Sequence, residues 1–202
     1  MTLNYLALGD SYTIGEGVSQ ENSFPYLLVQ KLREDGLQIN DPQVIAKTGW
    51  TTDELITAIK DKEIEGKFDL VTLLIGVNNQ YRGYSKENYR AEFLELLQTA
   101  LRYSDFDKKN VFVISIPDWG ITPFAENANR NATNISREID DFNAVNKEEA
   151  LQAGIAYVDI IPEFKRAASD PSMLAADRLH PSGKMYAEWV EKLAATIRGS
   201  RH

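Results

Sequence analysis

The apolar residues of this chain gather in short runs that are closed by glycine, proline, asparagine or aspartate. Runs of this kind, rich in Val, Ile and Leu and bounded by turn-forming residues, are typical of buried strands. Five of them predict strands at residues 3–8, 44–46, 70–75, 111–116 and 155–158.

The segments between these runs have a different period. Their apolar residues recur at intervals of three or four, which places them on one face of a helix. This periodicity predicts helices over residues 24–32, 55–59, 89–101, 135–151 and 185–197. Residues 117–134 form the longest stretch without a clear period, and we expect an irregular loop there, of a length that is often functional or mobile.

Strands that alternate with helices are joined by right-handed crossovers into a parallel sheet that is covered on both faces. The pattern therefore predicts a doubly wound α/β fold with a five-stranded parallel sheet. No internal repeat, low-complexity tract or linker interrupts it, so we expect a single domain over residues 1–202. Ligands of such folds bind beyond the carboxyl ends of the strands. The segments to inspect are residues 9–17, 47–52, 76–84, 117–124 and 170–182.

Composition and charge narrow the choice of partners. Hydrophobic residues make up 43% of the chain and charged residues 26%, as in an ordinary globular protein. The formal charge of -8 repels phosphate backbones and anionic head groups, so we expect no nucleic-acid partner. The absence of cysteine excludes disulfides, a thiol nucleophile and thiolate metal sites, and it suits a reducing compartment.

The first residues show no basic segment followed by an apolar one, because residues 6–8 run straight into the polar Gly9, Asp10 and Ser11. No apolar run approaches the roughly 20 residues that span a bilayer. We therefore expect a cytoplasmic protein without a membrane span, and the sequence indicates no particular oligomeric state.

Histidine is scarce in this chain. It has two histidines, and since one of them is the terminal His202, His180 is the candidate general base of the folded body. Asp177 precedes it by three residues, a spacing at which one irregular turn aims a carboxylate at the imidazole Nδ1 while Nε2 faces elsewhere. The alternative interpretation is a charged surface loop ahead of a helix that begins near Ser182.

Three further strand ends carry residues of chemical interest. After the first strand, Ser11 can expose its Oγ and its own N–H at the sheet edge, although it also suits a helix cap. After the second, Gly49 lets a backbone N–H approach a ligand that a side chain would block. After the third, Asn78 offers a side-chain amide donor, but asparagine is also a common turn residue.

These four segments occur in the order of the sequence blocks that give the SGNH (GDSL-type) hydrolases their letters: Ser, Gly, Asn and His. The blocks read Gly9-Asp10-Ser11, Gly49, Gly76-Val77-Asn78 and Asp177-Arg178-Leu179-His180-Pro181. Together they span almost the whole chain, which therefore resembles this family.

The resemblance implies a three-layer α/β/α fold of flavodoxin type. It also implies a serine hydrolase that cleaves carboxylic esters through a covalent acyl-enzyme, with no cofactor and no metal. In that mechanism Ser11 is the nucleophile, His180 the base and Asp177 the acid that orients the base.

The resemblance further implies an oxyanion hole formed by the N–H groups of Ser11 and Gly49 with the side chain of Asn78. The third block of the family more often reads Gly-x-Asn-Asp, whereas Asn79 stands at its last position here. Any role of that carboxylate in holding the loop is therefore missing from this chain.

For the substrate we expect a small ester with an acetyl or other small acyl group, a thioester or an acetylated sugar. SGNH relatives include esterases, lipases, thioesterases and carbohydrate deacetylases, and the sequence favours none of these. Aromatic residues that follow the predicted strands are candidates to line a substrate pocket, although core packing explains them equally well. They are Trp50, Tyr81, Tyr84, Trp119 and Phe124, and Asp10 and Asn79 are further substrate-binding candidates.

Three other functions compete with this interpretation. A nucleotide- or flavin-binding module would suit the fold, but neither G-x-G-x-x-G nor G-x-x-x-x-G-K-[ST] occurs. An α/β-hydrolase needs G-x-S-x-G, and the residue two after Ser11 is Thr13. A noncatalytic SGNH-like binding protein would be expected to lack the Ser or the His, and both are present.

Overall fold

All strands join in one parallel sheet in a computed structural model that describes residues 2–62, 64–128 and 130–200. The strands are β1 (Tyr5–Gly9), β2 (Gln43–Ala46), β3 (Leu70–Leu74), β4 (Val111–Ile114) and β5 (Ala156–Val158). Their order across the sheet is β2-β1-β3-β4-β5, the flavodoxin-like order with β1 and β3 at the centre. The predicted fold class and the five predicted strands are confirmed.

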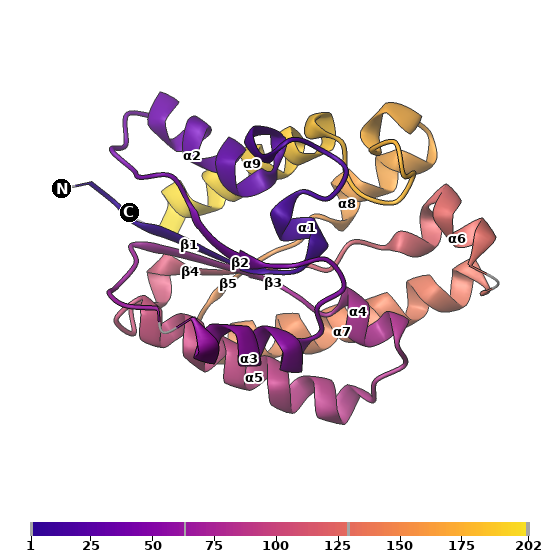
Figure 1. Ribbon diagram of the computed structural model, residues 1–202, viewed down its shortest axis with the longest axis horizontal. Coiled ribbons are helices and arrows are strands. Elements are labelled where there is room, and N and C mark those ends of the chain that lie inside the picture. The colour runs from indigo at the N-terminus through magenta and orange to yellow at the C-terminus, as the bar shows by residue number, and fades with distance from the viewer. Residues whose placement is uncertain (1, 63, 129, 201–202) are drawn as a thin grey trace.

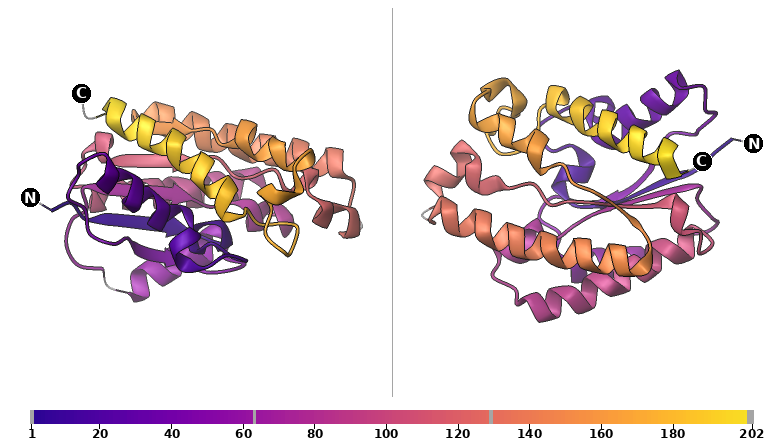
Figure 2. Two further views of the ribbon diagram at one scale, coloured as in Figure 1. Left: turned by 90° about the horizontal axis from the view of Figure 1, so that it is seen from above. Right: turned by 180° about the vertical axis from the view of Figure 1, so that it is seen from behind.

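Helices cover both faces of the sheet, as Figures 1 and 2 show. One face carries α1 (Ser11–Ile14), α2 (Phe24–Glu34), α8 (Ile161–Phe164) and α9 (Gly183–Ser200). The other carries α3 (Thr52–Asp61), α5 (Lys86–Tyr103) and α7 (Ala132–Ala153), with the short α4 (Val77–Tyr81) and α6 (Pro123–Asn127) beyond the strand ends. Short 3₁₀ turns are η1 (Gln20–Asn22), η2 (Lys108–Asn110), η3 (Trp119–Ile121), η4 (Lys165–Ala168) and η5 (Pro171–Met173).

The two central strands are buried along their full length, because helices shield both faces. This explains why β1 and β3 read as nearly continuous apolar runs instead of alternating ones. On α2, the buried residues Phe24, Leu28 and Leu32 recur every four positions and turn toward the sheet. The same periodicity produced the predictions for the five long helices, and these are confirmed.

The predicted loop at residues 117–134 is more ordered than its sequence suggested. It contains η3, α6 and the start of α7. The Asp118 side chain accepts a hydrogen bond from the N–H of Gly120, and the Asn131 side chain accepts one from the N–H of Asn134, both at 3.0 Å. The first cap closes η3, which is too short to show a helical period, and the second begins α7 before its first buried apolar residue.

Candidate active site

Ser11 lies at the start of α1, immediately beyond the end of β1. The turn is tight, because a Cβ at Gly9 would overlap the carbonyl oxygen of Leu74 on the neighbouring strand. The Asp10 carboxylate caps the helix by accepting a hydrogen bond from the N–H of Tyr12 at 3.0 Å. Since the first N–H groups of a helix have no partner within it, the Ser11 N–H can serve a ligand.

His180 lies on the loop that precedes α9. Its carbonyl accepts a hydrogen bond from the N–H of Ala175 at 2.8 Å, which folds the loop back on itself. Between them Arg178 adopts φ 61°, the left-handed region that a tight turn requires. The turn brings the side chain of Asp177 round to the imidazole of His180.

Asp177, His180 and Ser11 form one line of hydrogen bonds. The Nδ1 atom of His180 lies 2.6 Å from Oδ2 of Asp177, and its Nε2 atom lies 2.9 Å from Oγ of Ser11. Burial alone would raise the pKa of Asp177, but hydrogen bonds from His180 and from the N–H of Leu179 outweigh it and lower the pKa. A carboxylate, an imidazole and a hydroxyl in this order can activate a serine as a nucleophile.

Gly49 and Asn78 lie at the same sheet edge. Gly49 has φ +83° in a turn that the N–H of Trp50 closes by donating to the carbonyl of Lys47 at 3.2 Å. The Nδ2 atom of Asn78 donates to the carbonyl of Trp50 at 2.9 Å, which leaves its second amide hydrogen for a ligand. The Gly49 N–H makes no hydrogen bond to other residues of the described ranges.

Ser11, Gly49, Asn78 and His180 line one cavity of about 250 Å³ at the carboxyl edge of the sheet. Beyond this edge lie α4 and α6, on the right of Figure 1. The remaining lining residues are Tyr12, Thr48, Val77, Tyr81, Trp119, Phe124 and Leu179. Ser11 and His180 are only 5% and 7% exposed, so the hydroxyl and the imidazole are largely shielded from bulk water.

One side of the cavity is an aromatic wall formed by Tyr81, Trp119 and Phe124. The Trp119 ring lies 5.5 Å from the Tyr81 ring and 6.2 Å from the Phe124 ring between centroids. Its Nε1 donates to Oε1 of Gln80 at 2.7 Å, which satisfies the buried indole and fixes the ring. Trp119 is almost fully buried, whereas Tyr81 and Phe124 are exposed at the rim.

Four of the predicted substrate-binding residues, Asp10, Trp50, Asn79 and Tyr84, do not line this cavity. Asp10 is fully buried and caps α1, and Trp50 contributes a backbone carbonyl to the Asn78 amide. Asn79 is fully buried and turns to Thr52, whose N–H donates to its Oδ1 at 3.1 Å and whose Oγ1 accepts from its Nδ2 at 2.6 Å. The structure therefore places Asn79 where it holds the loop after β2, while Trp119 does line the cavity.

The lining residues that the sequence did not single out each stand beside a residue that it did. Tyr12 follows Ser11, Thr48 precedes Gly49, and Leu179 precedes His180. The Tyr12 ring packs against the His180 ring with centroids 5.0 Å apart. The sequence could have indicated these lining residues because each one is adjacent to a residue of a motif.

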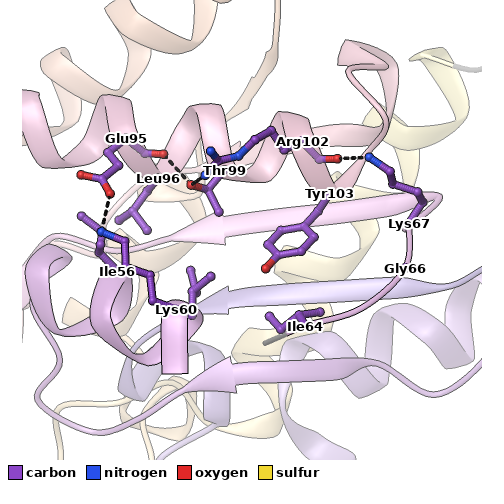
Figure 3. A pocket seen from close by; sticks show the side chains of 11 residues that line it. Ile56, Lys60, Ile64, Gly66, Lys67, Glu95, Leu96, Thr99, Arg102 and Tyr103 are labelled. Atoms are coloured by element: carbon purple, nitrogen blue, oxygen red, sulfur yellow. Dashed lines mark hydrogen bonds and ion pairs between the residues drawn. The ribbon is translucent and has the colours of Figure 1, made fainter. Parts of the chain in front are cut away.

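A larger cavity of about 380 Å³ lies at the opposite, amino edge of the sheet, between the ends of α3 and α5 (Figure 3). Lys60 there pairs with Glu95 at 3.0 Å, and Lys67 donates to the carbonyl of Arg102 at 2.8 Å. His180, the histidine within the described residues, does not line it, so the described lining of this cavity lacks the imidazole that a serine nucleophile needs.

No group of three or more His, Asp or Glu side chains within the described ranges is placed to hold a metal ion. None of the helices in the described part of the chain is long and apolar enough to cross a membrane. His202, the second histidine, lies outside the described residues.

Comparison with known proteins agrees with this geometry. The model of the GDSL-like lipase/acylhydrolase family matches residues 7–188, which include every residue of the hydrogen-bonded line. The spore germination lipase LipC of Bacillus licheniformis is 27% identical over 217 aligned positions, which cover 98% of this chain and 98% of that protein.

Solved structures share the fold at lower identity. The crystal structure of TesA superposes with a TM-score of 0.76 at 20% identity and covers 98% of this chain and 99% of that one. Axe2-W215I, an acetyl xylan esterase from Geobacillus stearothermophilus, has a TM-score of 0.74 at 21% identity and covers 96% of this chain and 94% of that one. These likenesses show the SGNH hydrolase fold.

Proposed function

Since this chain belongs to the GDSL-like lipase/acylhydrolase family and is a carboxylic ester hydrolase, we propose that Ser11 is its nucleophile. The observation that carries the proposal is the unbroken line from Asp177 through His180 to the Ser11 Oγ, with contacts of 2.6 and 2.9 Å. A noncatalytic binding protein has no need of this alignment.

In the acylation step, Nε2 of His180 takes the proton of Ser11 as Oγ attacks the ester carbonyl carbon. The Asp177 carboxylate holds the tautomer with the proton on Nδ1 and stabilises the imidazolium that forms. When the tetrahedral intermediate collapses, its bond to the alkoxy oxygen breaks and His180 donates the proton to the leaving alcohol. The acyl group then remains on Ser11.

In deacylation, a water molecule replaces the alcohol. His180 accepts a proton from the water as its oxygen attacks the acyl carbon, and it returns that proton to Ser11 when the ester bond to Oγ breaks. The products are the free acid and the regenerated enzyme, and the cycle uses only groups of this chain and water.

Three donors stabilise the oxyanion in each half of the reaction: the N–H groups of Ser11 and Gly49 and the free amide hydrogen of Asn78. All three residues line the same cavity. Such donors lower the barrier because they point at the place where charge develops, and loss of one typically lowers turnover by about 10²- to 10³-fold.

The acyl group of the substrate is small, and the aromatic wall is its binding surface. A cavity of about 250 Å³ with one largely apolar side suits an acetyl or short acyl chain, since apolar contacts favour its burial. Among the similar proteins are one described as a lipase and one as an acetyl xylan esterase. The leaving group projects toward the open rim of the cavity, whether it is a simple alcohol, a sugar or the thiol of a thioester.

The experiment that tests the nucleophile uses Ser11→Ala with p-nitrophenyl acetate. We expect turnover to fall by at least about 10⁴-fold, because the hydroxyl is the attacking group, with an unchanged melting temperature. A fluorophosphonate should label Ser11 in the parent protein, as read by peptide mass spectrometry. Retained activity of Ser11→Ala would overturn the proposal, and loss of that activity on chelation of metals would point to a metal-dependent reaction instead.

The substrate class is tested with p-nitrophenyl esters of increasing acyl length, acetylated xylose oligomers and an acyl thioester. We expect the highest kcat/KM for the shortest acyl groups. A maximum at a long acyl chain would contradict the small acyl pocket and leave the role of Ser11 untouched.

A further inference from the structure

The loop between β2 and α3 carries the Gly49 N–H, yet it lies at the surface. Lys47 and Thr48 are exposed, and Gly49 and Trp50 are half-buried. A donor contributes to oxyanion stabilisation only if it is held in its reactive orientation before the reaction. Something other than burial must therefore fix the backbone of this loop.

Arg82, the residue that ends α4, reaches this loop from the neighbouring strand end. Its Nη2 donates to the carbonyl oxygen of Gly49 at 2.6 Å and lies 3.3 Å from Oε2 of Glu54. If Gly49 carried a Cβ atom, that atom would lie 3.8 Å from the Nη2 atom of Arg82, which is van der Waals contact. The guanidinium therefore lies directly against Gly49, a residue that lines the cavity.

Glu54 extends the contact to the far side of the loop. Its Oε2 accepts hydrogen bonds from the N–H and the Oγ1 of Thr51, at 2.9 and 3.0 Å. These bonds, with help from the nearby Arg82 charge, lower the pKa of Glu54 and keep it ionised against the effect of its partial burial. The ion pair thus binds the loop backbone at two points: Arg82 binds the carbonyl of Gly49, and Glu54 binds the N–H of Thr51.

Stability alone does not account for this ion pair. The side chains of Arg82 and Glu54 are 42% and 40% exposed, and pairs this exposed contribute little to the free energy of folding. The geometry is specific, however: the single Nη2 atom of Arg82 contacts both the carbonyl of Gly49 and the carboxylate of Glu54, so the pair ties the loop to the first turn of α3.

We infer that Arg82 is a positioning residue of the oxyanion site, which holds the Gly49 carbonyl so that the Gly49 N–H points at the developing oxyanion. The inference rests on the proposed function. It assigns Arg82 no contact with the substrate, because Arg82 does not line the catalytic cavity.

The test is Arg82→Ala, assayed with p-nitrophenyl acetate. We expect kcat to fall by roughly tenfold with KM within about twofold, since a misaimed donor loses part of the stabilisation that a deleted donor loses entirely. The rate of Ser11 labelling by a fluorophosphonate should fall in parallel, because that reaction also builds negative charge on oxygen. Arg82→Lys, which keeps a donor for Gly49, should recover part of kcat.

Arg33→Ala is the matched control. Like Arg82, Arg33 donates hydrogen bonds both to a backbone carbonyl, here of Ile39, and to a carboxylate, here of Asp41. Its side chain is 46% exposed. It lies at the amino edge of the sheet, so its loss should leave kcat unchanged. A normal kcat in Arg82→Ala, or a fall equal to that in Arg33→Ala, would overturn the inference.

A double-mutant cycle distinguishes a role of Arg82 in positioning the oxyanion donors from a general loss of rigidity in the protein. If Arg82 acts through the oxyanion donors, Arg82→Ala and Asn78→Ala should be less than additive in kcat, since both impair one site. Full additivity would count against the inference. If Ser11→Ala stays active, the proposed function itself fails, whereas an inactive Ser11→Ala beside a fully active Arg82→Ala defeats only the role of Arg82.

Discussion

At the scale of single residues, Asp10 precedes Ser11, the proposed nucleophile, but does not line the cavity. It is fully buried, and burial raises the pKa of its carboxyl to about 7, although the N–H of Tyr12 opposes the rise. Its Oδ2 atom has no hydrogen-bond partner in the described part of the chain. A buried carboxyl oxygen without a hydrogen-bond partner favours the protonated form.

This carboxyl should make the stability of the protein depend on pH. The unfolded chain releases the proton near pH 3.9 and the folded protein near pH 7, so the folded state holds an extra proton between these values. The free energy of unfolding should therefore fall as pH rises through this window, by up to about 4 kcal/mol from this group. Asp10→Asn keeps an acceptor for the Tyr12 N–H and removes the titration, so its stability should change less with pH.

Urea unfolding between about pH 4 and pH 8 measures the difference. Asp61→Asn, at the exposed end of α3, is the control and should keep the slope of the parent protein. An Asp10→Asn variant with that same slope would show that Asp10 does not titrate in this range.

Asn78 and Asn79 belong to one sequence motif, but the motif does not say which of the two side chains faces the cavity. They are consecutive residues of α4, where successive side chains point about 100° apart. When Asn78 faces the cavity, Asn79 must therefore face elsewhere, and it binds Thr52 on α3. The sequence block identified both residues. Only the structure shows that the Asn78 side chain faces the cavity while the Asn79 side chain binds Thr52.

At the scale of elements, the apolar pattern predicted the sheet and the long helices well. Strands buried on both faces give short continuous apolar runs, and helices with one buried face give a period of 3.6. The short elements escaped it. Helix α6 begins with Pro123 and spans five residues, too few to show a period. The aromatic wall depends on these short elements. The sequence therefore offered its residues as pocket candidates but could not separate them from Trp50 and Tyr84, which do not line the cavity.

Trp119, held by η3, should set the length of acyl group that the enzyme accepts. Trp119→Ala enlarges the cavity on the side of the aromatic wall, so kcat/KM for a hexanoyl ester relative to an acetyl ester should rise at least about tenfold. The change removes a buried indole and should lower stability by roughly 3 kcal/mol, so folding is checked by circular dichroism.

Tyr84→Ala is the control for this change. Tyr84 also follows β3, but it does not line the catalytic cavity, so its loss should leave the chain-length ratio unchanged. An unaltered ratio in a folded Trp119→Ala protein would mean that the acyl group binds elsewhere.

At the scale of the whole molecule, the active site joins the two ends of the chain. Ser11 and His180 are 169 residues apart in sequence, and their contact depends on how α9 docks against α2. The Tyr186 hydroxyl, on α9, donates to the carbonyl of Tyr12 at 3.0 Å. Because the Tyr12 ring also packs on the His180 ring, the docking of α9 also supports the position of the His180 imidazole.

The net charge of the molecule should act on the substrate before it binds. Thirty acidic and 22 basic side chains give a formal charge of -8, and such a field attracts cations and repels anions over roughly one Debye length, about 10 Å at 0.1 M salt. Acetylcholine and 3,3-dimethylbutyl acetate have the same shape and differ by one positive charge on the alcohol. At low salt, kcat/KM should be a few-fold higher for the cation.

Salt separates this long-range effect from a specific contact. At about 1 M salt the Debye length is near 3 Å, so the two kcat/KM values should converge while the value for the neutral ester changes little. A preference for the cation that persists at high salt would indicate a local binding site for the ammonium group. Equal values at low salt would mean that the basic residues near the cavity, Lys47 and Arg82 among them, cancel the field of the acidic surface where the alcohol enters.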